Sequence, residues 1–256
     1  MNGGASLPGT AKTGPPIVRI GEVESTNDVA RVLALAGVPE GAVVVARRQT
    51  RGRGRWGRAW AAPPGGVWCS VLLRPTATHP WGLLSLAVAV GAAEAIEKTT
   101  GVKTGIRWPN DLVVDGRKVA GVLLEGAGDA VIVGIGINAN VALDALPEDV
   151  APRATSLHLA AGQPIDSDGL REAVVGRLMH WYRIWSAGGR GTTEAWMRRD
   201  VSRGTRVTAG SPGRTVEGIA EGIDGDGALL LRLASGEIRR VLTGDLIPAS
   251  GARGAD

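Results

Sequence analysis

The stretch RGRGRWGR at residues 51–58 combines four arginines, three glycines and one tryptophan. Glycine lets the backbone approach a ligand closely and adopt positive φ, while arginine offers planar donors that match carboxylate and phosphate oxygens. The stretch therefore predicts a loop that folds around a small anion. Two other interpretations stay open from these residues alone: a solvated basic turn, and an arginine–glycine segment that binds RNA loosely.

The positive charge of the chain is concentrated in and just before this loop. Residues 47–58 hold six of the 29 Lys and Arg residues and no acidic residue, so the rest of the chain has 23 basic against 25 acidic residues. A duplex-binding protein usually spreads its cations along a face that meets many phosphates. The distribution favours one cationic loop on a near-neutral protein over a nucleic-acid-binding surface.

A second candidate stretch is RWPNDLVVDGRKVAGVLLEG at residues 107–126. Pro109 disfavours helix at the residue before it, so Asn110 and Asp111 are presented where the next strand begins. Lys118 stands at the start of another predicted strand, where its ammonium group can point into a cleft. Taken alone, WPND is more typical of a turn with a packed tryptophan, and an isolated lysine is more typical of the protein surface.

Two further stretches place polar groups beside predicted elements. Gly134 and Gly136 interrupt the apolar run VIVGIGINAN. They indicate either a ligand or backbone that comes close, or a simple bulge. Asn138 follows on the same alternation and can hydrogen-bond a polar ligand group. In ESTND, Ser25 or Thr26 can cap a helix, and the N–H groups of its first turn can also bind an anion or amide.

The elements that must position these residues do not follow the regular order of a doubly wound sheet. The strands are too closely spaced for a crossover helix after each, which predicts an α+β fold with a mixed sheet and flanking helices. Strands are predicted at 17–23, 42–47 and 67–74 and at four places in TGIRWP, DLVVDGRKVAGVLLE and AVIVGIGINAN; helices are predicted from Ser25 to Gly37, from Pro80 to Gly101, and at 168–186 and 192–199.

The pattern changes near residue 202, where short alternating strands separated by glycine turns begin. They predict a small all-β domain that resembles an SH3-like barrel. We expect a flexible N-terminus at 1–16, a large domain at 17–201 and the β domain at 202–250. Cys69 is the only cysteine, so no intrachain disulfide can form. Because neither a membrane-spanning run nor a signal-peptide block is evident, we expect a cytoplasmic protein.

Each of these motifs alone is a weak signal, but five of them in this order are specific for one family. They are ESTND, Q-x-x-GRGRWGR-x-W, RWPND, GRKVAG-x-L-x-E and GIGINAN. They resemble the biotin protein ligase family over roughly residues 18–140, and the C-terminal β domain also fits. The resemblance implies the fold shared by class II synthetases and biotin–lipoate ligases, with a catalytic biotin- and ATP-binding domain at 17–201. A lipoate or octanoate protein ligase is the close alternative, and a nucleic-acid-binding module is the alternative from another class.

The resemblance implies an ATP-dependent reaction in two steps, with biotin and ATP as substrates and Mg²⁺ as a cofactor. The biotin carboxylate attacks the α-phosphorus of ATP, which gives biotinyl-5′-AMP and pyrophosphate. A lysine of a biotin carboxyl carrier domain, in acyl-CoA or pyruvate carboxylases, then attacks the acyl carbon and AMP leaves. The cationic loop would offset the repulsion between carboxylate and polyphosphate.

The resemblance also implies roles for individual residues. Lys118, Arg53 and Asp111 are the expected catalytic residues: Lys118 bridges the carboxylate and the α-phosphate, Arg53 contacts both groups, and Asp111 binds Mg²⁺ or orients the incoming lysine. The expected biotin contacts are Ser25, Thr26, Asn27, Gln49, Arg53, Gly54, Arg55 and Lys118. The expected ATP and adenylate contacts are Arg53, Arg55, Trp60, Asn110, Asp111, Lys118 and Asn138, with Trp60 stacked on adenine.

The sequence departs from the family pattern at two positions. Arg107 stands where the motif usually has lysine, and Arg51 stands where many members have a small residue. An arginine keeps the charge but changes the reach of the side chain. The resemblance starts by residue 18, so we expect a ligase without an N-terminal helix-turn-helix domain and without a DNA operator. We expect no membrane partner, and a monomer or weak homodimer.

Overall fold

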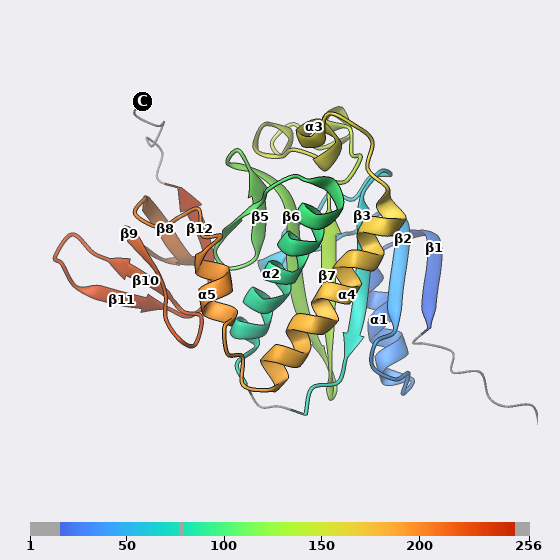
Figure 1. Ribbon diagram of the computed structural model, residues 1–256, viewed down its shortest axis with the longest axis horizontal. Helices are drawn as coiled ribbons and strands as arrows, with labels where there is room; N and C mark the ends of the chain where they lie inside the picture. Colours follow the sequence, from blue (N-terminus) through green and yellow to red (C-terminus); the bar gives the residue numbers. More distant parts are fainter. Residues whose placement is uncertain (1–15, 77–78, 249–256) are drawn as a thin grey trace, which may run out of the picture.

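The fold is described by a computed structural model, which covers residues 16–76 and 79–248. Its larger sheet has seven strands in the order β1-β2-β3-β7-β6-β5-β4. β1 and β2 are parallel, and the other neighbouring strands are antiparallel. Helices cover both faces of this mixed sheet, which confirms the predicted α+β class (Figure 1).

The strands of the larger sheet follow the apolar runs of the sequence. All seven residues of the interior strand β3 are buried, as expected for a strand covered on both faces. Asp115 and Gly116 form the tight turn of a hairpin in this sheet, with φ values of 49° and 74°. The strands are β1 (Ile17–Val23), β2 (Val43–Gln49), β3 (Val67–Leu73), β4 (Gly105–Arg107), β5 (Asp111–Val114), β6 (Arg117–Ala127) and β7 (Ala130–Ile137).

The helices divide between the two faces of this sheet. α1 packs through Ala30 and Ala34 against one face, while α2 and α4 lie side by side across the other (Figure 1). α2 is apolar on nearly all sides because it lies between the sheet and α4. No helix of the described residues is both long and apolar enough to cross a membrane. The α-helices are α1 (Thr26–Leu35), α2 (Trp81–Thr100), α3 (Leu157–Ala161), α4 (Ser167–Ser186) and α5 (Thr192–Met197).

The C-terminal part forms a separate antiparallel sheet, with the strand order β11-β10-β9-β8-β12. Its apolar side chains join the main core, and the indole of Trp108 donates to the carbonyl of Gly227 at 3.1 Å. The boundaries at 17–201 and 202–250 stay predictions, and residues 1–15 and 249–250 of the predicted segments lie outside the described residues. The strands are β8 (Arg206–Ser211), β9 (Arg214–Ile223), β10 (Leu229–Arg232), β11 (Ile238–Val241) and β12 (Asp245–Pro248).

Candidate active site

A cavity of about 400 Å³ lies on the α1 face of the larger sheet, where β12 of the smaller sheet contributes to its wall. All of the site residues expected from the sequence line this one cavity, although they come from separate elements. Their individual roles stay predictions. The residues are Ser25, Thr26, Asn27, Gln49, Arg53, Gly54, Arg55, Trp60, Asn110, Asp111, Lys118 and Asn138.

One end of the cavity is formed by the first turn of α1. Ser25 caps the helix by accepting from the backbone N–H of Asn27 at 3.3 Å. The backbone N–H and the hydroxyl of Thr26 both donate to Oε1 of Gln49, at 2.8 and 3.0 Å. This pairing leaves the Nε2 group of Gln49 without an acceptor among residues 16–76 and 79–248, so it can donate to a ligand. The N-terminus of this helix, predicted from the sequence, thus also orients a pocket amide through Thr26.

Asn27 lies at the centre of a buried polar network at this end. Its Nδ2 group donates to Glu125 at 2.7 Å, while its Oδ1 atom accepts from the hydroxyl of Ser70 at 2.6 Å. A Cβ atom at Gly134 would lie 2.5 Å from the same Oδ1 atom. The close neighbour that this glycine indicated is therefore the side chain of Asn27.

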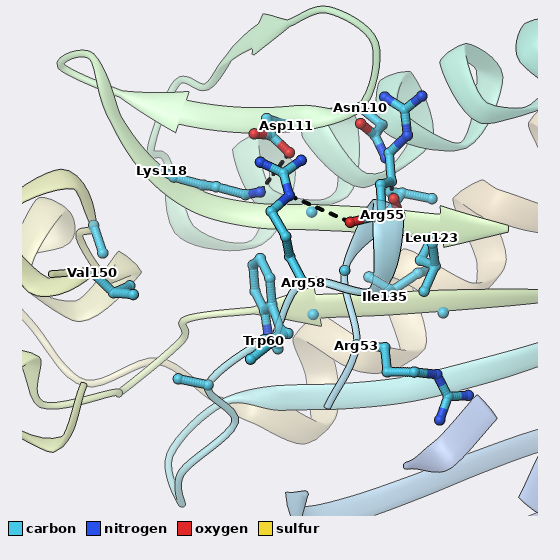
Figure 2. Close-up of a pocket in the computed structure, with 18 of the residues that line it drawn as sticks. Arg53, Arg55, Arg58, Trp60, Asn110, Asp111, Lys118, Leu123, Ile135 and Val150 are labelled. Carbon is cyan, nitrogen blue, oxygen red and sulfur yellow. Dashed lines mark hydrogen bonds and ion pairs between the residues drawn. The ribbon is translucent and has the colours of Figure 1, made fainter. Parts of the chain in front are cut away.

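Arg53 joins this network rather than the opposite end of the cavity. Its guanidinium donates two hydrogen bonds to the carboxylate of Asp28, at 2.8 and 2.7 Å, and one to Glu125 at 3.2 Å. The bidentate contact holds the pKa of Asp28 below its usual value. Figure 2 shows Arg53 pointing away from Lys118 and Asp111. A direct role of Arg53 at the reacting phosphate therefore requires its side chain to change partners.

The opposite end of the cavity contains a lysine–carboxylate pair. The Nζ atom of Lys118 lies 2.6 Å from Oδ1 of Asp111, and the two side chains face each other in Figure 2. The β5–β6 hairpin positions both residues, because they lie on its two adjacent strands. The same ammonium group lies 4.9 Å from the centre of the Trp60 ring, within the range of a cation–π contact.

The indole of Trp60 packs closely over two glycines of the sheet. A Cβ atom at Gly136 would lie 2.8 Å from the indole, and one at Gly121 would lie 3.2 Å from it. The Nε1 group of Trp60 is buried and has no hydrogen-bond partner in the part of the chain that is described; the same holds for Oδ1 of Asn138. Both residues line the cavity, so a ligand with complementary groups can satisfy these atoms.

The arginine–glycine loop is fastened to the smaller sheet. Arg55 donates to the carbonyl of Gly244 and pairs with Asp245 at 3.1 Å, and Arg58 pairs with the other oxygen of the same carboxylate. Burial lowers the pKa of Arg55, and the charge of Asp245 opposes that shift. Trp56 at the tip adopts a φ of 59°, an unusual conformation for a residue other than glycine. β12 therefore helps to hold the loop over the cavity.

Three further residues complete the site: Ser70, Glu125 and Asp245. Glu125 ends the GRKVAG-x-L-x-E motif but was assigned no role, and local pattern gives no signal for Ser70 or Asp245. Glu125 alternates with Gly121 and Leu123 along β6, so period-two alternation could have placed it on the cavity face. Ser70 lies in a continuous apolar run with no alternation to assign its face. The position of Asp245 depends on how the two sheets pack together, which local pattern does not determine.

Comparison with known proteins gives consistent matches along the chain. Residues 21–141 match the Biotin/lipoate A/B protein ligase family, and residues 204–247 match the Biotin protein ligase C terminal domain. The chain is 36% identical to the bifunctional ligase/repressor BirA of Bacillus subtilis, over 88% of this chain and 71% of that protein. It is 34% identical to the biotin–[acetyl-CoA-carboxylase] ligase of Paracoccus denitrificans, over 85% of this chain and 94% of that protein.

Solved structures show the same relationship in three dimensions. The biotin protein ligase of Aquifex aeolicus, solved in complex with biotin and ATP, superposes with a TM-score of 0.82 at 30% identity. The match covers 91% of this chain and 97% of that chain. A match of this length extends over both sheets.

Proposed function

This chain belongs to the biotin protein ligase family and is an ATP-dependent biotin–protein ligase, and we propose that both of its half-reactions take place in the cavity between the first turn of α1 and Lys118. One observation carries the proposal: all the residues that five separated motifs single out line that cavity. The biotin- and ATP-bound relative supports biotin and ATP as the substrates.

The floor of the cavity suggests how biotin lies in it. Along β6, the residues Glu125, Leu123 and Gly121 alternate onto the cavity face, from the Asn27 network to the indole of Trp60. Four residues of strand span about 13 Å at roughly 3.3 Å per residue. We propose that the polar head group binds at Thr26, Asn27 and Gln49, that the apolar chain crosses Leu123, and that the carboxylate reaches Lys118.

In the first step, a carboxylate oxygen of biotin bonds to the α-phosphorus and the bond from that phosphorus to the bridging oxygen breaks. Pyrophosphate leaves with the electron pair, and no proton is transferred. The ammonium of Lys118 stabilises the negative charge that the two reacting groups share. Its pairing with Asp111 at 2.6 Å holds that ammonium in place before the substrates arrive. Trp60 provides the apolar face on which adenine stacks.

In the second step, the neutral amine of a carrier lysine bonds to the acyl carbon, and the bond from that carbon to the phosphate oxygen breaks. The amine must lose a proton for the amide to form. Asp111 borders the cavity with a side chain 29% exposed, so it can orient the amine and accept that proton. Arg55 and Arg58, fastened by Asp245, keep the loop over the adenylate and limit its hydrolysis.

Mg²⁺ fits this site as a companion of ATP rather than as a resident ion. The described residues contain no group of three or more His, Cys, Asp or Glu side chains that could hold a metal. Mg²⁺ commonly uses one or two carboxylates and takes its other ligands from phosphates and water. Asp111 would supply the carboxylate, and the ion would neutralise phosphate charge.

The protein substrate is a biotin carboxyl carrier domain, and we propose those of acyl-CoA and pyruvate carboxylases. The proposal includes a monomer or weak homodimer without operator binding or a membrane partner, in the cytoplasm. These finer points rest on the sequence resemblance. A gel shift with DNA and sedimentation of the purified chain would test the operator and oligomer predictions.

The test is biotin-dependent exchange of labelled pyrophosphate into ATP, followed by labelling of an added carrier domain. The purified chain with Mg²⁺ should catalyse exchange with biotin in the absence of carrier, and should then label one carrier lysine. Lipoate and octanoate serve as competing acids in parallel reactions. Exchange supported by lipoate and not by biotin would overturn the substrate assignment, and folded protein with no exchange would overturn the reaction.

A further inference from the structure

The cations of the cavity differ in whether a carboxylate already neutralises them. Four of them are paired: Arg53 with Asp28 and Glu125, Arg55 and Arg58 with Asp245, and Lys118 with Asp111. Two further arginines line the cavity, Arg107 and Arg153. Neither contacts a carboxylate within residues 16–76 and 79–248; both donate only to neutral backbone carbonyls.

Arg153 is positioned by backbone contacts to the strand that carries Lys118. The N–H of Thr155 donates to the carbonyl of Lys118 at 2.9 Å, and Ala154 pairs with Lys118 in a parallel bridge. Arg153 immediately precedes this bridge, at the end of the short 3-10 helix Ala151–Arg153. The segment is thus held beside the end of the cavity where adenylation is proposed to occur.

The guanidinium of Arg153 keeps unused hydrogen-bonding capacity. Its Nε and Nη2 groups donate to the carbonyl of Asp149, at 3.2 and 2.8 Å. This contact orients the side chain without cancelling its charge. A cation that has no carboxylate partner can meet an anion without first breaking an ion pair, so it attracts a polyphosphate more strongly than the paired arginines.

We propose that Arg153 binds the β- and γ-phosphates of ATP and then the leaving pyrophosphate. The inference deepens the proposed function and rests on it. When the bond between the α-phosphorus and the bridging oxygen breaks, that oxygen takes the electron pair and the leaving group gains negative charge. An uncompensated guanidinium at the cavity, on the segment that bridges to the backbone of Lys118, stabilises this charge and lowers the barrier. The role belongs to the first half-reaction, because pyrophosphate is absent from the second.

The test compares Arg153→Gln and Arg153→Lys in the full chain, using pyrophosphate itself as the probe. In the biotin-dependent exchange assay, Arg153→Gln should raise the KM for pyrophosphate about tenfold, the size of effect expected for one charged hydrogen-bond donor. Arg153→Lys should give an intermediate KM because it keeps the charge but loses the planar fork. Transfer from synthetic biotinyl-5′-AMP to a carrier domain should fall much less than adenylation.

Arg183→Gln is the matched control, because it removes one charge from an exposed side chain on α4 that does not line the cavity. A KM for pyrophosphate in Arg153→Gln within twofold of wild type would overturn the inference. An equal rise in Arg183→Gln, or equal losses in adenylation and transfer, would also overturn it. Absence of exchange in the wild-type chain would instead show that the proposed function itself is wrong, and the inference with it.

Discussion

Lys118 lies in a cavity that already contains several arginines, so its contribution depends on position more than on charge. Its ammonium is 2.6 Å from Asp111 and its side chain is about one third exposed, so removing it should not unfold the protein. We expect Lys118→Ala to lower the biotin-dependent exchange rate about 10²- to 10³-fold, as for loss of one preorganised charge-stabilising donor. Lys118→Arg is the control that keeps the charge, and near-wild-type exchange by Lys118→Ala would refute the assigned role.

Two glycines on β7 allow the two substrate ends to be tested separately. A methyl group at Gly134 would collide with Asn27, and one at Gly136 would collide with Trp60. Both substitutions replace glycine by alanine in the same strand, so their direct effects on the strand are comparable. Each collision should cost about 1–3 kcal/mol through displaced side chains. We expect Gly134→Ala to raise mainly the KM for biotin, and Gly136→Ala mainly that for ATP, each about tenfold.

Steady-state exchange with each substrate varied in turn measures this difference, and each variant is the control for the other. Equal effects of both variants on both KM values would mean that the glycines only shape the sheet. The two positions also show what sequence pattern could and could not supply. The pattern indicated either a ligand or backbone close to these glycines, or a simple bulge. The neighbours are instead side chains from α1 and from the loop after β2, which only the folded chain brings there.

At the scale of elements, the arginine–glycine loop depends on an edge strand of the smaller sheet. Asp245 at the start of β12 accepts from both Arg55 and Arg58, which precede it in the sequence by 190 and 187 residues. We expect Asp245→Asn to loosen the loop, so that biotinyl-5′-AMP escapes and labels lysines of bystander proteins. Arg55→Gly should do the same. The measurement is the ratio of bystander to carrier labelling.

The matched control for this loop variant is Asp226→Asn, because Asp226 pairs with Arg240 inside the smaller sheet and does not line the cavity. It should leave the labelling ratio at the wild-type value. Labelling that stays confined to the carrier in Asp245→Asn would show that the loop is held by other contacts.

The elements predicted best from the sequence are those with a long apolar run or a clear hydrophobic period, ended by a local stop signal. β3, α2 and α4 were predicted within a few residues because their apolar runs and stops are local. α3 was missed since five residues are too few to show a helical period. The contact between β12 and the loop was also missed. It depends on the packing of one sheet against another, and no residue near Asp245 signals it.

At the scale of the molecule, the two sheets share one core rather than two. Trp196 is fully buried and packs in the same cluster as Val207 and Leu229 of the smaller sheet. The indole N–H of Trp108 donates a hydrogen bond to the carbonyl of Gly227, so the WPND motif that borders the cavity also joins the two sheets. The position of Asp245 at the cavity therefore depends on this junction, and we expect the stability of the junction to affect catalysis.

Gly227 allows this coupling to be measured against a close control. It has a φ of 84°, and a Cβ atom there would lie 2.7 Å from Leu86 on α2; Gly236 has a φ of 88° with nothing within 4 Å. Alanine should cost about 1–2 kcal/mol at either site through backbone strain, and about 1–3 kcal/mol more at Gly227 through the collision. We expect Gly227→Ala to separate the sheets and raise bystander labelling, and Gly236→Ala to do neither.

Tryptophan fluorescence and hydrogen exchange together report on the separation in increasing denaturant. All eight tryptophans precede the smaller sheet, but Trp108 and Trp196 contact it, so fluorescence reports on the larger part together with the junction. Exchange of peptides from β8 to β10 reports on the smaller sheet alone. In wild type and Gly236→Ala the unfolding midpoints from fluorescence and from exchange should coincide, because two sheets that share one core unfold cooperatively. In Gly227→Ala the smaller sheet should exchange at lower denaturant. Coincident midpoints in all three proteins, with unchanged labelling, would mean that the junction at Gly227 does not control the loop.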